Sequence, residues 1–132
     1  MVVDTSALVA ILLAEPGYER LRDAMARAED VLVPAPVRVE AGIVMAPRTG
    51  PGGLADLDDL LVQTGARVLP FTEAHARAAV EAFLRFGKGR QAAGLNFGDC
   101  MTYAVTQGQG RAVLFTGDDF ARTNVSVAER GG

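Results

Sequence analysis

The sequence predicts an α/β fold in which a mostly parallel sheet lies between two layers of helices. Short runs of β-branched and apolar residues alternate with longer segments of helical periodicity, which is typical of strand–helix–strand units. The first strand, residues 1–3, is followed by an apolar run at 7–13, as expected for a strand in the middle of such a sheet. Because composition does not shift along the chain, we expect residues 1–132 to form a single domain.

The elements follow from local patterns along the chain. Thr5 and Ser6 are good caps for a first helix that runs to Leu13, and residues 18–28 form an amphipathic second helix. Strands are expected at 31–33, 67–71, 112–115 and 124–127. Further helices are expected at 37–45, at 54–62, after Thr72 as far as Leu84, and at 96–107. Pro47 is expected to end the helix at 37–45, ahead of the flexible residues 49–53.

Composition and charge restrict the function classes. A hydrophobic fraction of 49% and a charged fraction of 22% are typical of a globular protein. The single cysteine, Cys100, cannot form an internal disulfide, and neither a signal peptide nor a membrane-spanning run is recognisable, so we expect a cytoplasmic protein without membrane contact. The net charge of −3 disfavours nucleic-acid binding, unless several of the acids surround cations.

Most of the notable acids have a structural explanation when taken singly. Asp4 ends the first strand and could cap the first helix, and Asp99 follows Asn96 at the spacing of a capped first turn. Asp118 and Asp119 follow a glycine in a turn, where Asp is common.

Glu40 is harder to explain structurally, because the helix around it has almost no polar face. A carboxylate buried there without a partner costs several kcal/mol or stays protonated, so we expect a cation or several donors beside it. A salt bridge to Arg38 is the alternative if this face is half exposed.

The acids are more informative together, because the carboxyl ends of parallel strands meet at one edge of the sheet. Carboxylates that converge there cannot all ionise without cations, and oxygen ligands suit Mg²⁺ or Mn²⁺. A divalent cation that activates water and stabilises charge on a phosphate indicates phosphodiester hydrolysis. The alternative from another class is a non-catalytic signalling module, such as a phospho-acceptor domain.

Six stretches together resemble the PIN-domain ribonucleases, and within them the VapC-type toxins of type II toxin–antitoxin pairs. They are residues 2–10, Glu15-Pro16, 39–41, 87–90, 94–100 and 114–120. The most specific is the Asn-Phe-Gly-Asp-Cys stretch at 96–100, whereas the opening motif is weak alone.

The resemblance implies an α/β/α PIN-like domain that cleaves RNA with Mg²⁺ or Mn²⁺. It carries catalytic and metal-binding roles onto Asp4, Glu40 and Asp99, and a fourth onto Asp119, with Asp118 as the alternative. It further implies a homodimer and a cognate antitoxin that binds over or near the acidic groove. Exposed apolar residues of the first two helices could serve those contacts, although core packing explains them almost as well: Leu12, Leu13, Leu21 and Met25.

Two further groups are supporting candidates. Thr5, Ser6 and Thr116 neighbour the acids and could orient a carboxylate or bind metal-bound water, although such residues more often cap or turn. The basic run Arg85, Lys88 and Arg90 could hold RNA phosphates, and a solvated loop explains it equally well.

Overall fold

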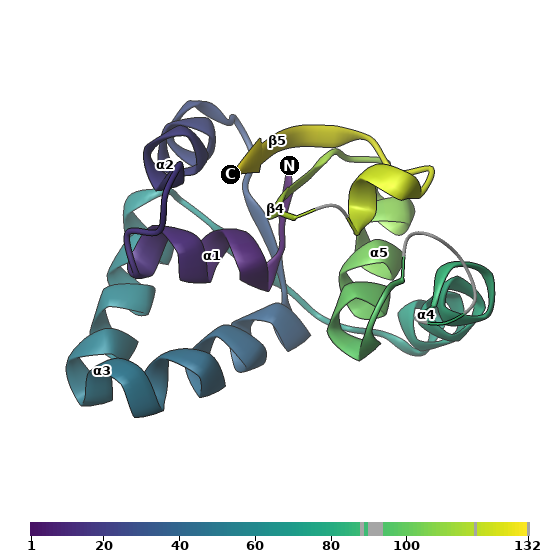
Figure 1. Ribbon diagram of the computed structural model, residues 1–132, viewed down its shortest axis with the longest axis horizontal. Coiled ribbons are helices and arrows are strands. Elements are labelled where there is room, and N and C mark those ends of the chain that lie inside the picture. The colour runs from purple at the N-terminus through teal and green to yellow at the C-terminus, as the bar shows by residue number, and fades with distance from the viewer. Residues whose placement is uncertain (88, 90–93, 118, 132) are drawn as a thin grey trace.

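The computed structural model describes residues 1–87, 89, 94–117 and 119–131, which alternate between strands and helices (Figure 1). In chain order the elements are β1 (Val2–Val3), α1 (Thr5–Leu12), α2 (Tyr18–Arg27), β2 (Leu32–Pro34), α3 (Ala35–Gln63), β3 (Arg67–Leu69), α4 (Glu73–Phe86), α5 (Phe97–Gln109), β4 (Val113–Thr116), the short 3₁₀ helix η1 (Phe120–Arg122) and β5 (Val127–Gly131).

The described strands form one parallel sheet with the order β3-β2-β1-β4-β5. The chain moves outward from β1 through β2 to β3, and then returns to the other side of β1 for β4 and β5. In sheets of this type, ligands bind outside the carboxyl ends of the strands at the point where the strand order reverses. Asp4, directly after β1, is therefore at that point.

Helices cover both faces of the sheet, which confirms the predicted three-layer α/β architecture (Figure 1). Helices α1, α2 and α3 lie on one face, where Val3, Val33 and Leu114 belong to their core. Helices α4 and α5 lie on the other, where Val113 and Phe115 belong to a second core. Successive residues of β4 thus point to opposite faces, as strand geometry requires. Within the described residues, no helix is long and apolar enough to cross a membrane.

Helix α3 differs from prediction, because Pro47 does not end it. The helix continues through Pro47 and changes direction only at Gly50, where φ is 63° and ψ is −156°. Proline fixes φ near the helical value, so the helix can continue past it at the cost of one backbone hydrogen bond. Gly50 provides the break because glycine adopts a positive φ without strain. The two helices predicted at 37–45 and 54–62 are therefore the two halves of α3.

Three smaller expectations are also corrected. The strand predicted at 67–71 ends at Leu69, because Pro70 has no N–H for the sheet. The last strand begins at Val127 instead of Asn124, whose side chain is used to accept a hydrogen bond from the Tyr103 hydroxyl. Leu21 and Met25 are completely buried, so core packing is the correct explanation for both.

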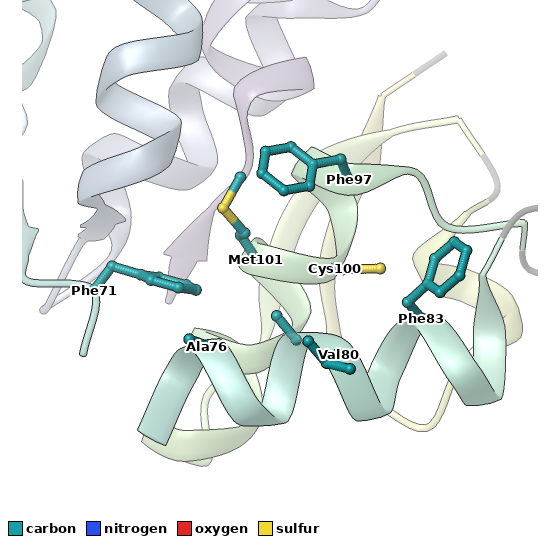
Figure 2. A pocket seen from close by; sticks show the side chains of 8 residues that line it. Phe71, Ala76, Val80, Phe83, Phe97, Cys100 and Met101 are labelled. Atoms are coloured by element: carbon teal, nitrogen blue, oxygen red, sulfur yellow. The ribbon is translucent and has the colours of Figure 1, made fainter. Parts of the chain in front are cut away.

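Helices α4 and α5 leave an apolar groove between them, of about 380 Å³ (Figure 2). Phe71, Val80, Phe83, Phe97 and Met101 are among the residues that line it. Val80 is 61% exposed and Phe97 is 82% exposed. This face is therefore an apolar surface that the described chain leaves uncovered.

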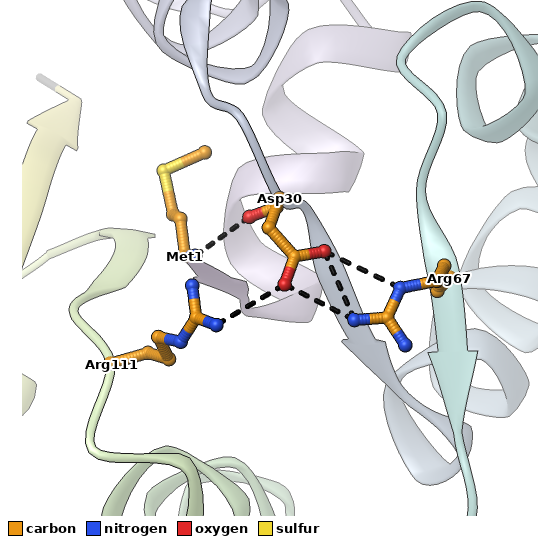
Figure 3. Close-up of polar contacts among 4 residues, drawn as sticks. All are labelled: Met1, Asp30, Arg67 and Arg111. Carbon is orange, nitrogen blue, oxygen red and sulfur yellow. Dashed lines mark hydrogen bonds and ion pairs between the residues drawn. The ribbon is translucent and has the colours of Figure 1, made fainter.

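An ionic cluster around Asp30 connects the strands at the amino edge of the sheet, which is the edge away from Asp4 (Figure 3). The Asp30 carboxylate accepts two hydrogen bonds of 3.1 Å from Nη2 of Arg67 and lies 3.3 Å from Nη2 of Arg111. The Met1 ammonium donates to the Asp30 carbonyl at 2.8 Å. These contacts connect the amino ends of β1, β2, β3 and β4, at the end of the sheet away from Asp4.

Candidate active site

A polar groove of about 390 Å³ lies at the carboxyl edge of the sheet. The acids predicted from sequence contribute to its lining: Asp4, Glu40, Asp99 and Asp119. They come from the end of β1, the first half of α3, the start of α5 and the turn after β4. The structure therefore brings these four acids together, whereas Asp118 lies outside the described residues.

Asp4 is buried, with 4% of its surface exposed, and both of its carboxylate oxygens accept hydrogen bonds. Oδ2 accepts from Ser6 N at 3.1 Å and from Ser6 Oγ at 2.7 Å, and Oδ1 accepts from Thr102 Oγ1 at 2.8 Å. Burial raises the pKa of Asp4, while these hydrogen bonds act in the opposite direction. The Ser6 N–H contact also caps α1, which confirms the structural explanation of Asp4, and its position in the groove leaves it available to a ligand.

The predicted supporting residues connect the elements that carry the acids. Ser6 Oγ accepts a hydrogen bond of 3.0 Å from the backbone N–H of Thr116, which joins the end of β4 to the Asp4 site. Thr5 Oγ1 donates to Oε1 of Glu40 at 2.5 Å. Two of the three therefore orient carboxylates through their hydroxyls, and Thr116 contributes through its backbone.

Glu40 is exposed, which corrects the expectation of an apolar environment. Its neighbours Val39 and Ile43 are also exposed, at 59% and 69%, because this side of α3 faces outward. The Glu40 carboxylate lies against the start of α5, where a Cβ on Gly98 would come within 3.0 Å of both carboxylate oxygens. A side chain at Gly98 would thus displace Glu40, so the glycine permits this close approach.

Asp99 is held by a capping box at the start of α5. Its backbone N–H donates to Asn96 Oδ1 at 2.9 Å, and its Oδ2 accepts from Asn96 N at 3.1 Å. Burial raises the pKa of Asp99 to about 7, and the Asp4 and Asp119 carboxyls act in the same direction, against the Asn96 hydrogen bond. The Asp99 carboxyl therefore holds its proton to a higher pH than an ordinary aspartate does.

The described acids supply only oxygen ligands, and such a donor set fits Mg²⁺ or Mn²⁺ better than zinc. Within the part of the chain that the structure describes, no three acidic, histidine or cysteine side chains already form a closed metal site. A divalent cation held here would require some carboxylates to turn further into the groove. Glu40 is exposed, and in the present arrangement Thr5 Oγ1 holds its Oε1.

The predicted basic residues do not join this groove in the described structure. Arg85 lies over the Phe86 ring, with 4.7 Å between its guanidinium carbon and the ring centroid, and lines another pocket with Glu81 and Tyr103. Lys88 and Arg90 lie outside the described residues.

Several residues of the groove region were not predicted as site residues from sequence, and Glu15, Arg48 and Thr102 are the ones among them that bear most on its chemistry. Glu15 and Arg48 line the groove, and the buried Thr102 donates a hydrogen bond to Asp4. Helical spacing was the available signal, because Thr102 follows Asp99 by three residues and Arg48 follows Glu40 by eight. Spacing alone could not show which face of each helix meets the acids.

Comparison with known proteins gives consistent matches over most of the chain. The PIN domain family matches residues 1–125. Ribonuclease VapC36 of Mycobacterium tuberculosis is 43% identical over 126 residues, which cover 95% of this chain and 91% of the relative. Ribonuclease VapC of Mycolicibacterium smegmatis is 40% identical over 127 residues, which cover 96% and 98% respectively.

Two solved structures share the fold at low sequence identity. VapC20 of M. tuberculosis, a toxin that cleaves the sarcin–ricin loop, has a TM-score of 0.77 at 21% identity, over 94% of this chain and 95% of the other. VapBC2 from Rickettsia felis, bound to a DNA fragment from its promoter, has a TM-score of 0.78 at 12% identity, over 99% and 98%. These two likenesses support the architecture alone.

Proposed function

The chain belongs to the PIN-domain family and, like its VapC relatives, is an endoribonuclease of the toxin class; we propose that it cuts RNA with a divalent cation held by the acids of the groove. The observation that carries the proposal is the convergence of acids from β1, α3, α5 and the turn after β4 on one groove. The raised pKa of Asp99 supports it, because perturbed carboxyls of this kind are typical of catalytic sites.

The cation is Mg²⁺ or Mn²⁺, and its ligands are Asp4, Glu40, Asp99 and Asp119. When bound, such an ion activates water for attack on a phosphodiester and neutralises charge on the phosphate. The protein orients the ligands: Ser6 and Thr102 fix the Asp4 carboxylate, Thr5 fixes Glu40, and Asn96 fixes Asp99. A bound cation would favour the charged form of the Asp99 carboxyl, whose pKa burial raises to about 7.

The test is metal-dependent cleavage by wild type and by Asp99→Asn. Asn keeps an oxygen that can accept the capping hydrogen bond, so the fold is expected to survive while a ligand charge is lost. Asp59→Asn is the matched control, because Asp59 is an exposed acid of α3 outside the groove. We expect wild type and Asp59→Asn to cleave RNA with Mn²⁺ but not with EDTA, and Asp99→Asn to be inactive. Equal activity with EDTA would contradict the metal mechanism.

We propose that the cognate antitoxin covers the groove and the exposed apolar side of α3 next to it. Val39 and Ile43 flank Glu40 in sequence and are exposed, so one partner segment could contact both them and the acids. Co-expression with the antitoxin should neutralise wild type but not an Ile43→Asp variant that still cleaves RNA. An antitoxin that neutralises both equally would exclude this surface.

Because the substrate of this ribonuclease is RNA, we propose that the protein acts in the cytoplasm.

We further propose that the protein is a homodimer in which the apolar groove between α4 and α5 is buried. Phe97 and Val80 are strongly exposed in this groove (Figure 2). Phe97 begins α5 and lies in the same first turn as Asp99. Sedimentation of wild type should give a dimer, and Phe97→Ser together with Val80→Ser should give a folded monomer. A variant that remains dimeric would exclude this face.

A further inference from the structure

Arg48 is a basic side chain in an otherwise acidic groove. Five carboxylates of described residues line the same groove: Asp4, Glu15, Glu40, Asp99 and Asp119. Glu40, Val44 and Arg48 recur every four residues along α3, and all three line the groove, so this helix forms one of its walls. Eight residues of helix place the Arg48 backbone about 12 Å from that of Glu40.

The Arg48 guanidinium has no ion pair or hydrogen bond within the described part of the chain, and its residue is exposed. Other arginines are paired: Arg38 of the same helix with Asp58, and Arg77 with Glu73 on α4. An unpaired guanidinium presents a planar set of donors that matches the oxygens of a phosphate. Arg48 is thus available to an anion that enters the groove.

The continuation of α3 past Pro47 determines the position of Arg48. If α3 ended at Pro47, Arg48 would lie in a loop, but the helix continues to the break at Gly50. Arg48 therefore occupies the last turn of the first half of α3. Side chains on a helix lean toward its amino end, and for Arg48 this is the end at which Val44 and Glu40 lie.

We propose that Arg48 binds a phosphate of the RNA strand that neighbours the phosphate being cut, and that it thereby fixes the direction of the strand across the acids. This inference rests on the proposed ribonuclease function. The acids repel every phosphate that no cation neutralises, so a strand needs a positive contact beyond the metal site. If the cation is held by Glu40 and the other acids, a phosphate contact at Arg48, two helical turns from Glu40, would make the two directions of the strand unequal.

Arg48→Gln tests this role in single-turnover cleavage of purified bacterial ribosomal RNA with Mn²⁺, at increasing enzyme concentration. We expect the enzyme concentration for half-maximal rate to rise about tenfold, which corresponds to ~1.4 kcal/mol. The maximal rate should stay close to that of wild type. The slope of log affinity against log salt should fall by about 0.7, the value for one phosphate contact on a single strand. Arg48→Lys should keep this salt slope, because it keeps the charge.

Arg77→Gln is the matched control, because it removes an equal charge from a paired, exposed arginine away from the groove. It should leave the half-maximal concentration and the salt slope unchanged. Mn²⁺ affinity, measured by calorimetry, should be the same in wild type and Arg48→Gln, since Arg48 is not a ligand.

The inference is overturned if Arg48→Gln behaves like Arg77→Gln. It is also overturned if the variant loses thermal stability and maximal rate while its salt slope is unchanged, because Arg48 would then only stabilise the end of its helix. The parent proposal fails separately, when wild type does not cleave RNA or when Asp99→Asn cleaves it as well as wild type. Either result would also remove the basis for a phosphate contact.

Discussion

The hydroxyl of Thr102 offers the most direct test of how the protein orients its acids. Thr102 is completely buried, and its Oγ1 donates to Oδ1 of Asp4 at 2.8 Å. Thr102→Val keeps the shape of the side chain and removes this donor. A hydrogen bond to a charged group contributes about 1.5–3 kcal/mol. If the bond positions Asp4 as a ligand, its loss should weaken Mn²⁺ binding roughly tenfold to a hundredfold.

The assay is Mn²⁺ titration by calorimetry at pH 8, above the pKa of about 7 of Asp99, so that proton competition is small. Thr102→Ser should bind Mn²⁺ like wild type, because it restores the hydroxyl. Thr106→Val is the matched control: Thr106 is another buried threonine of α5, but its Oγ1 donates to the Thr102 carbonyl at 2.8 Å and not to an acid. Melting temperatures of all three variants report whether each remains folded.

A folded Thr102→Val protein that binds Mn²⁺ within a factor of about two of wild type would refute this reasoning, since a change that small is below the energy of a charged hydrogen bond. Equal weakening by Thr106→Val would also refute it, because the effect would then come from loss of any buried hydroxyl in α5.

Three other predictions follow from the site. The raised pKa of Asp99 means that the folded, metal-free protein keeps a proton that the unfolded chain loses near the ordinary pKa of 3.8. The contribution of Asp99 to the free energy of unfolding is therefore fully present below that pH, and it is lost as the pH rises through about 7. The melting temperature of wild type should be higher at pH 5 than at pH 8, and Asp99→Asn should reduce this difference. The same pH dependence in wild type and variant would contradict this assignment. For the same reason, Mn²⁺ binding at pH 6 should release about one proton, which calorimetry in buffers of different ionisation enthalpy measures. Gly98→Ala should slow cleavage, because its Cβ would lie 3.0 Å from the Glu40 oxygens, while Gly108→Ala, whose nearest contact is 3.6 Å from His75 Nε2, should not.

Local patterns predicted the order of the elements, because each short strand and each helix carries its own signal. They failed at Pro47, where a general rule about proline was applied to a helix that the tertiary structure continues to Gly50. They also failed for Glu40. The apolar neighbours Val39 and Ile43 suggested a buried face, yet they point outward. Burial depends on which side of a helix meets the sheet, and one sequence does not contain that information.

Asp4 and Asp119 were predictable because they follow strands of a parallel sheet, whose carboxyl ends converge whatever the details of packing. Glu40 and Asp99 lie on helices, and their assignment depended more on the resemblance to the PIN-domain ribonucleases. The residues that orient them were less predictable. Ser6 and Asn96 lie within three residues of their acids, so local motifs suggested both. Thr102 lies 98 residues from Asp4 in the chain, and Arg48 contributes through a kinked helix. Such partners are determined by helix packing and become visible only in three dimensions.

Helix capping and metal binding were competing explanations for Asp4 and Asp99, and the structure makes them compatible. Asp4 accepts the first-turn N–H of α1, and Asp99 forms the capping box of α5. Each cap fixes the rotation of a carboxylate before any ion is present, so less freedom remains to be lost on binding. The backbone N–H of each cap also offsets part of the effect of burial on the pKa of its carboxyl. Replacing either acid by Asn should therefore remove ligand charge and leave its helix capped. Replacement by Ala should remove both, and should lower thermal stability as well as metal affinity.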